Sequence, residues 1–77
     1  MRYYFDIRDA NGLIEDDEGQ DLPDRAAMRA AAIGALPLVA HDELPDGDLA
    51  LFSVRVRDAD GRYVFHASLT LVAEDLP

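Results

Sequence analysis

Arg57-Asp58-Ala59-Asp60-Gly61 decides the fold, because it nearly repeats Arg8-Asp9-Ala10-Asn11-Gly12 from the start of the chain. Alternating apolar residues flank each copy, and an alanine-rich stretch lies between the two. An Asn-Gly or Asp-Gly pair between alternating runs is a strong hairpin signal, because glycine adopts a positive φ without steric cost. The sequence therefore predicts a hairpin, a helix and a second hairpin.

The second hairpin has the clearer register. A two-residue Asp60-Gly61 turn gives three apolar cross-strand pairs: Val56 with Phe65, Val54 with Ala67, and Phe52 with Leu69. Tyr63 is expected on this same core face. Leu51 and Val64 are the large apolar residues expected on the opposite face, among polar neighbours. This pattern predicts an antiparallel sheet with one face packed on the core and one face exposed to solvent.

The first hairpin leaves two registers open. Its first strand alternates, with Tyr3, Phe5 and Ile7 expected inside and Tyr4 expected outside between Arg2 and Asp6. A loop of residues 10 and 11 with Gly12 as a bulge sets Ile7 against Ile14. A tight Asn11-Gly12 turn would set Ile7 against Asp16, which is less favourable.

The middle segment predicts one helix, opened by Asp21-Leu22-Pro23-Asp24 and running to about Glu43. Asp21 is expected to accept hydrogen bonds from first-turn amides, and proline is tolerated in that turn. Pro37 removes a backbone donor, which predicts a kink or break near residues 34–37. Helical spacing turns one arc toward the sheet: Met28, Ala31, Ala32, Ala35, Leu38 and Val39. It leaves the following four residues on the solvent side: Arg25, Arg29, Ile33 and Leu36.

Together these elements predict a single α+β domain over residues 1–77, in the order ββαββ. One helix is expected to pack on one face of an antiparallel sheet of about four strands. The order of the strands does not follow from the sequence, because the first and last strands could be adjacent or apart.

The composition limits the classes of partner. Sixteen acidic residues against seven basic ones give a net charge of −9, which opposes binding to nucleic acid and to anionic membranes. A basic partner, or solubility alone, fits this charge better. The absence of cysteine excludes disulfides, thiol nucleophiles and cysteine-based zinc sites. No apolar run approaches the roughly 20 residues that span a bilayer, and no leader-like pattern opens the chain, so a cytoplasmic location is expected.

The acidic run 15–18, with Asp21 and Asp24 nearby, is the candidate metal site. Aligned as an EF-hand loop on Gly12, the chain offers Asp9, Asn11 and Glu18 as ligands but places Ile7 at the first position, where it cannot bind a cation. We therefore expect no metal or cofactor, and we interpret the run as a solvated loop whose acids cap the next helix. A Ca²⁺-responsive domain ranks third among the candidate functions, ahead of an enzyme.

No constellation of residues predicts catalysis. His41 and His66 lie on different elements. Ser53, Ser68 and Thr70 would lie near His66 on a flat sheet face, which supplies no pocket in which a nucleophile and a base could converge. We expect no catalytic residues and no enzymatic activity.

Three motifs give the chain a resemblance to a family of short bacterial proteins known only as a domain of unknown function. They are Arg2-Tyr3-Tyr4-Phe5-Asp6, then Asp16-Asp17-Glu18-Gly19-Gln20-Asp21-Leu22 before the alanine-rich helix, and a closing hairpin with Arg57-Asp58-x-x-Gly61. The resemblance implies a stand-alone cytoplasmic protein and carries no activity. The chain also resembles HicB-type antitoxins in topology, but only Asp21-Leu22-Pro23 is similar to their Phe-Pro-Asp-Leu-Pro-Gly-Cys segment.

The expected function is a self-associating protein-interaction module, most simply a homodimer. A small core without disulfide or metal supplies about 3–5 kcal/mol, and association would bury further apolar surface. The candidate surface comprises six residues: Arg25, Arg29, Ile33 and Leu36 on the helix, with Tyr4 and Val64 on the outer sheet face. The alternative is an antitoxin-like regulator that binds a basic protein through the acidic loop.

Overall fold

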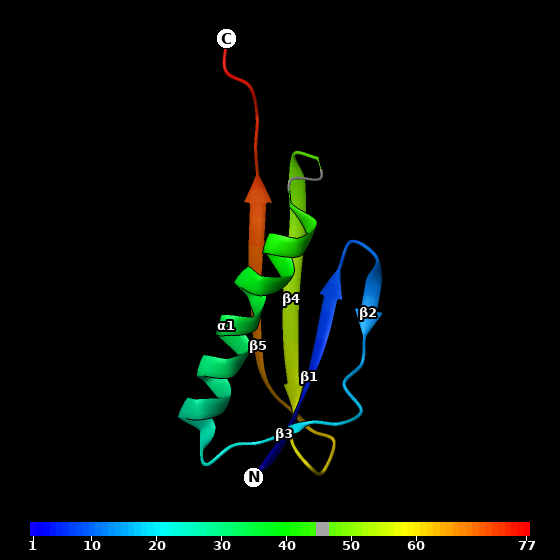
Figure 1. Cartoon of the computed structure of the whole chain (residues 1–77), viewed down its shortest axis with the longest axis vertical. Coiled ribbons are helices and arrows are strands. Elements are labelled where there is room, and N and C mark those ends of the chain that lie inside the picture. Colours follow the sequence, from blue (N-terminus) through cyan, green and yellow to red (C-terminus); the bar gives the residue numbers. More distant parts are fainter. Residues whose placement is uncertain (45–46) are drawn as a thin grey trace.

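Strands β1 (Arg2–Asp9) and β4 (Leu49–Arg57) form the centre of an antiparallel sheet that carries one helix on one face (Figure 1). The computed structural model describes residues 1–44 and 47–77. Strand β2 (Gly12–Ile14) pairs with β1, β5 (Tyr63–Val72) pairs with β4, and the strand order is β2-β1-β4-β5. The predicted α+β class and ββαββ order are confirmed.

One short strand was not predicted. Strand β3 (Gln20–Asp21) pairs with Arg2 and Tyr3 of β1, on the same edge that β2 covers further along. The acidic run 15–18 connects these two short partners. The first strand of the chain therefore becomes a central strand, which the local pattern alone could not indicate.

The first hairpin adopts the more favourable of its two predicted registers. Ile7 faces Ile14 and Asp9 faces Gly12, which leaves Ala10 and Asn11 as the loop. Gly12 has a φ of +118°, and the Asp9 side chain accepts a hydrogen bond of 2.8 Å from the amide of Asn11.

The second hairpin confirms the three apolar pairs but not the predicted turn. Asp60 does not have the positive φ that a two-residue Asp-Gly turn of this kind requires. Instead the amide of Gly61 donates to the carbonyl of Asp58 at 3.0 Å, and Gly61 follows this turn with a φ of +84°. The Asp58 side chain accepts from the amides of Asp60 and Arg62 and so fixes the longer loop.

A bulge at Val64 restores the register that the longer loop would have shifted. Val56 pairs with Phe65, whereas the next residue of β4, Arg57, pairs with Tyr63. Because one extra residue in a strand reverses the alternation of faces, the predicted faces of Tyr63 and Val64 are wrong. Tyr63 lies beside Arg57 on the outer face, and Val64 packs against the core.

Helix α1 (Arg25–Glu43) begins after Asp24, whose side chain accepts a 2.8 Å hydrogen bond from the amide of Ala27. The prediction that Asp21 caps the helix is wrong, because Asp21 belongs to β3. The helix continues through Pro37 without a break. None of the described helical residues belongs to a helix that is both long and apolar enough to cross a membrane.

The face that the helix presents to the sheet is rotated from the predicted one. Met28 and Ala32 are buried and Ala31 and Val39 pack against the core, as predicted, but Leu36 rather than Leu38 faces the sheet. The buried residues of α1 recur every four positions: Met28, Ala32, Leu36 and Ala40. Leu36 is 4% exposed and Leu38 is 70% exposed, the reverse of the prediction. Alanine and other apolar residues occur all around α1, so its sequence gives only a weak indication of which face packs against the sheet. The buried row of helix residues completes a core with five strand residues: Tyr3, Phe5, Phe52, Val54 and Val56.

Candidate functional site

Asp6 is the one charged residue among the buried described residues, although it lies on the outer face of β1. Its carboxylate accepts two hydrogen bonds of 2.9 Å from Arg57, one from Nε and one from Nη2. It also accepts from the Tyr63 hydroxyl at 2.8 Å and from the amide of Asp16 at 3.0 Å. A paired arginine and a bidentate geometry are the conditions under which a buried carboxylate is stable.

Asp16 organises the acidic run. Its Oδ2 accepts from the amide of Phe5, and its Oδ1 accepts from the amides of Glu18 and Gly19, each at 3.0 Å. Its backbone carbonyl accepts from Arg57 Nη2 at 2.7 Å. The Asp16 side chain therefore provides a hydrogen-bond acceptor for the amide of Phe5 on the edge of β1, in the gap between β2 and β3. The interpretation that the acids of this loop cap the next helix is wrong for Asp16, whereas Asp24 at the end of the loop does cap it.

These contacts change the acidity of the groups involved. The hydrogen bond from Arg57 holds the pKa of Asp6 below its ordinary value, against the opposing effect of burial. Burial would raise the pKa of Asp16, but hydrogen bonds from the amides of Gly19, Phe5 and Glu18 outweigh it, so that pKa is also lowered. The hydrogen bond to Asp6 raises the pKa of Tyr63.

The lowered carboxyl pKa values predict a loss of stability in acid. A carboxyl group whose pKa is lower in the folded state stabilises the fold above its ordinary pKa, which is 3.8 for Asp6. That contribution disappears as the pH falls through the folded-state pKa. We expect the urea midpoint to change little between about pH 7 and pH 5 and to fall steeply below about pH 4. An equal midpoint at about pH 7 and pH 3 would contradict this origin of stability.

The side chains of Asp6, Asp16, Arg57 and Tyr63 are hydrogen-bonded to one another or to backbone groups. The Arg57 guanidinium also lies 5.1 Å from the centre of the Tyr4 ring, and Arg55 lies 4.0 Å from the centre of the Tyr63 ring. Over residues 1–44 and 47–77, no group of three acidic or histidine side chains is placed to hold a metal ion. The arrangement joins the first strand, the acidic run and the last hairpin.

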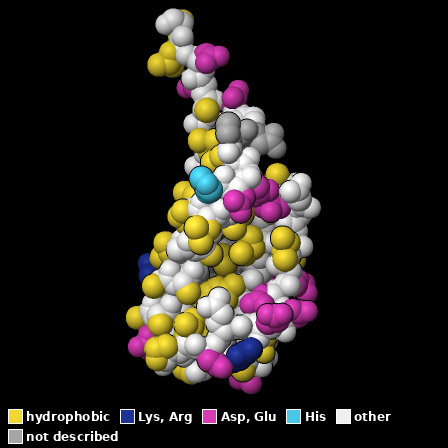
Figure 2. All heavy atoms as spheres, viewed as in Figure 1, with side chains coloured by type: hydrophobic (Ala, Val, Ile, Leu, Met, Phe, Trp, Pro, Cys, Tyr) yellow, Lys and Arg dark blue, Asp and Glu magenta, His cyan; other side chains and the backbone are white. Residues whose placement is uncertain are grey.

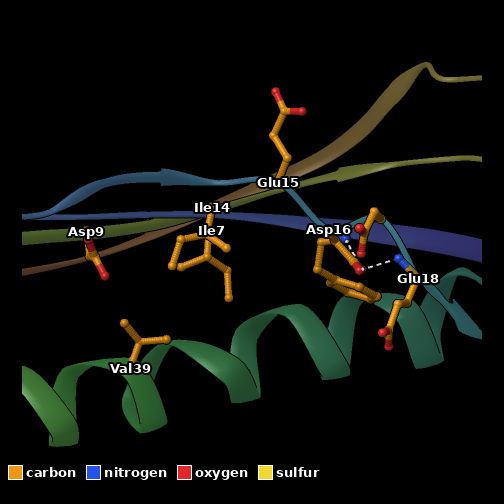
Figure 3. A pocket seen from close by; sticks show the side chains of 9 residues that line it. Ile7, Asp9, Ile14, Glu15, Asp16, Glu18 and Val39 are labelled. Carbon is orange, nitrogen blue, oxygen red and sulfur yellow. Dashed lines mark hydrogen bonds between the residues drawn. The ribbon is translucent and has the colours of Figure 1, made fainter.

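Two apolar depressions flank α1. On the β1 side, a hollow of about 320 Å³ has a floor of Phe5, Ile7, Ile14 and Val39. Figure 3 shows Ile7 and Ile14 pointing toward Val39 on the helix. Its rim is acidic, formed by Asp9 and residues 15–18. On the β5 side, a groove of about 310 Å³ lies between α1 and β5 and is lined mainly by apolar residues: Ile33, Leu36, Pro37, Ala67 and Leu69, with Ser68.

Comparison with known families identifies the chain. A family model described as a domain of unknown function, DUF6894, matches residues 2–70. The chain belongs to this family. Comparisons of the DUF6894 domain with curated proteins and with solved structures gave no match.

The structure of the DUF6894 domain separates the predicted interaction residues. Arg25, Arg29 and Ile33 are exposed on α1, and the Arg29 guanidinium lies 5.2 Å from the centre of the Phe65 ring. Leu36 was expected at the surface but is part of the core, because the buried row of α1 runs through it. Ile33 and Leu36 still meet, as neighbours in the groove beside β5.

The two sheet residues of the candidate surface lie elsewhere. Tyr4 is half-buried on the outer face beneath Arg57, as its strand position predicted. Val64 was expected on that face but packs against the core because of the bulge. The six residues therefore do not form one surface.

Sequence reasoning missed the Asp6 network of the DUF6894 domain. Three of its members lie in the recognised motifs: Asp6 ends the first, Asp16 begins the second, and Arg57 begins the third, while Tyr63 follows the third by two positions. Their membership of these motifs was the signal in the sequence that could have indicated the network. The motifs describe how distant segments are joined, which explains why they indicated no chemistry when taken separately.

Proposed function

We propose that this domain is a protein-interaction module that associates with a second copy of itself through the edge of β5. The supporting observation is the difference between the two edges of the sheet. One edge is covered by strands of only three and two residues, β2 and β3. The other is β5, which runs for ten residues and, in the described part of the chain, pairs only with β4.

Apart from the bulge at Val64 near its start, strand β5 lacks the usual protection of an exposed edge. Native proteins guard edge strands with lysine, proline, inward-pointing charges or short length. Residues 63–72 contain no proline and no Asp, Glu, Lys or Arg. A second β5 could therefore pair with it along most of its length, without burying a formal charge from either strand.

The apolar groove beside β5 adds side-chain contacts to this pairing. Ile33 is 45% exposed and Leu69 is 40% exposed at the groove. Antiparallel pairing about a two-fold axis keeps both helices on the same face, which brings the two grooves together. Each Å² of apolar surface buried contributes about 25 cal/mol, which matters in a domain whose own core supplies about 3–5 kcal/mol.

We infer no catalytic role for the domain. The titratable side chains that the structure gathers most closely, those of Asp6, Asp16, Arg57 and Tyr63, are hydrogen-bonded to one another or to backbone groups. A group held in this way stabilises the fold and is poorly placed to exchange protons with a substrate.

Sedimentation velocity at tens of micromolar is expected to show a dimer that dissociates in the variant Ile33→Glu. Each copy carries a charge of −9, so repulsion opposes association and added salt should strengthen it by screening. Leu36→Glu is unsuitable for this experiment, because Leu36 is 4% exposed and the variant would disrupt the core.

Leu38→Glu is the matched control for Ile33→Glu. Leu38 lies on the same helix and is 70% exposed, but it does not line the groove, so its dimer should persist. A monomer of 8.5 kDa at both low and high salt would contradict the proposal. Equal dissociation by both variants would show that their added charge, rather than the groove, controls association.

A further inference from the structure

The helix-bearing face of the sheet is only half covered. Helix α1 packs mainly on β4 and β5 and touches β1 less, and Figure 1 shows β2 and much of β1 to the side of the helix. Two adjacent strands span about 10 Å, which is close to the diameter of a helix with its side chains. The four-stranded face therefore has room for a second helix beside α1, over β1 and β2.

The uncovered half has the apolar surface that a second helix would need. This surface is the floor of the hollow, where Ile7 and Ile14 on the sheet face Val39 on α1 (Figure 3). Ile14 is 63% exposed, although it faces the helix side of the sheet. In the space-filling view, apolar side chains are visible in this depression between α1 and the acidic side chains at the edge of the molecule (Figure 2). An exposed apolar patch with a polar rim, as in this hollow, is typical of a binding surface.

The charge around the hollow selects the partner. Asp9 lies at one end and Asp16 and Glu18 lie at the other, whereas Glu15 points away (Figure 3). None of the described residues that line the hollow is basic. Both carboxylate oxygens of Asp16 accept from backbone amides, whereas Asp9 accepts one amide through Oδ1 alone. Asp17, Glu18 and Oδ2 of Asp9 therefore remain to meet an incoming charge.

We propose that the hollow binds a basic amphipathic helix of another protein. An apolar stripe of that helix would lie on Ile7, Ile14 and Val39, and arginine or lysine residues at both ends of the stripe would face the acids. Asp9 lies four positions along β1 from Phe5, whose amide donates to Asp16, and this corresponds to about 13 Å of strand. At about 1.5 Å per residue, the two basic groups of the helix would be roughly nine residues apart.

A second copy of this chain fits the hollow less well. The exposed basic residues of α1, Arg25 and Arg29, are one turn apart at one end of the helix, and Asp42 and Glu43 lie at the other end. Such a helix would place like charges together at one end of the hollow. The hollow also lies on the opposite side of α1 from the β5 groove, so this binding goes beyond the proposed self-association and does not depend on it.

The experiment uses a fluorescent synthetic peptide of about 18 residues, long enough to form a helix. It carries a leucine stripe flanked by arginines about nine residues apart, and a second peptide replaces each arginine with glutamate. We expect the basic peptide to bind and the acidic peptide not to bind. Raising the ionic strength from about 0.05 M to about 0.5 M should weaken binding, the opposite of the salt effect expected for self-association.

Two matched pairs of variants locate the site. Ile14→Ser should weaken binding at least about tenfold, since an exposed isoleucine that becomes buried contributes that much or more. Leu51→Ser should not, because Leu51 is 55% exposed on the outer sheet face. Glu18→Gln should weaken binding by roughly threefold as the loss of one screened charge pair, whereas Glu74→Gln, in the exposed C-terminal segment, should have no effect.

Amide shifts in a ¹⁵N titration should concentrate at Ile7, Ile14, Glu18 and Val39. Equal weakening by both members of either pair would overturn the proposal, because binding would then not depend on the position of the changed residue in the hollow. Shifts confined to β5, or equal binding of the acidic peptide, would also overturn it. Loss of the dimer in Ile14→Ser would overturn it too, by making a second copy the occupant of the hollow.

Discussion

Asp6→Ala is expected to leave much of the domain unfolded in water at 25 °C. The change removes the acceptor for Arg57 Nε and Nη2, for the Tyr63 hydroxyl and for the amide of Asp16. Removing one partner of a buried ion pair costs about 3–5 kcal/mol. The Arg57 side chain is 25% exposed and can recover some hydration, so the lower end, about 3 kcal/mol, applies. A core of this size supplies about as much.

Far-UV circular dichroism and urea unfolding measure this loss, and Asp17→Asn is its control. Asp17 lies in the same acidic run but is exposed, so removing its charge should leave the unfolding free energy within about 0.5 kcal/mol of wild type. A loss below about 1 kcal/mol in Asp6→Ala would show that the network is not a main source of stability. Asp6→Asn, which keeps the shape but not the charge, should lie between the two.

The strand pairing could be predicted from the sequence because it depends on local alternation. The pairs Val56 with Phe65 and Ile7 with Ile14 follow from requiring apolar residues to share a face. The second register was correct although its turn was not. The actual loop is one residue longer than the Asp60-Gly61 turn, and the bulge at Val64 compensates for that residue.

The remaining features depend on contacts between distant segments. Alternation placed Asp6 on the outer face, but its burial results from Arg57 and Tyr63, which are more than fifty positions away. Tyr63 reaches Asp6 only because the bulge reverses its face. The buried face of α1 could not be predicted for a different reason. Leu36 and Leu38 are equally apolar, and only packing against the sheet distinguishes them.

The hollow beside β1 was beyond prediction for a related reason. Its acidic rim could be recognised in the sequence, but its apolar floor combines Ile7, Ile14 and Val39 from three separate elements. The floor exists because α1 covers the β4 and β5 side of the sheet. Neither the helix position nor the strand order follows from the composition of any single segment.

Gly19→Ala is expected to cost about 3 kcal/mol of unfolding free energy, in a position that the sequence presents as an ordinary loop glycine. Gly19 has a φ of +75°, and an added Cβ would lie 2.9 Å from the Tyr3 carbonyl oxygen and 3.0 Å from Cε1 of Tyr4. The left-handed backbone costs a residue with a Cβ about 1–2 kcal/mol. The close contact adds about 1–3 kcal/mol, because the Tyr3 oxygen belongs to β1 and Tyr3 pairs with Gln20 of β3.

Gly61→Ala separates these two costs. Gly61 has a similar φ of +84°, but no atom would lie within 4 Å of its added Cβ, so this variant should lose only the backbone contribution of about 1–2 kcal/mol. Urea unfolding gives the loss of unfolding free energy in each variant, and the difference between the two losses measures the cost of the close contact at Gly19. Because the amide of Gly19 also donates to Asp16, Gly19→Ala should in addition reduce the fall in stability between about pH 7 and pH 3. Equal losses in the two variants would show that the acidic run moves aside at little cost and that Asp16 does not fasten it firmly to β1.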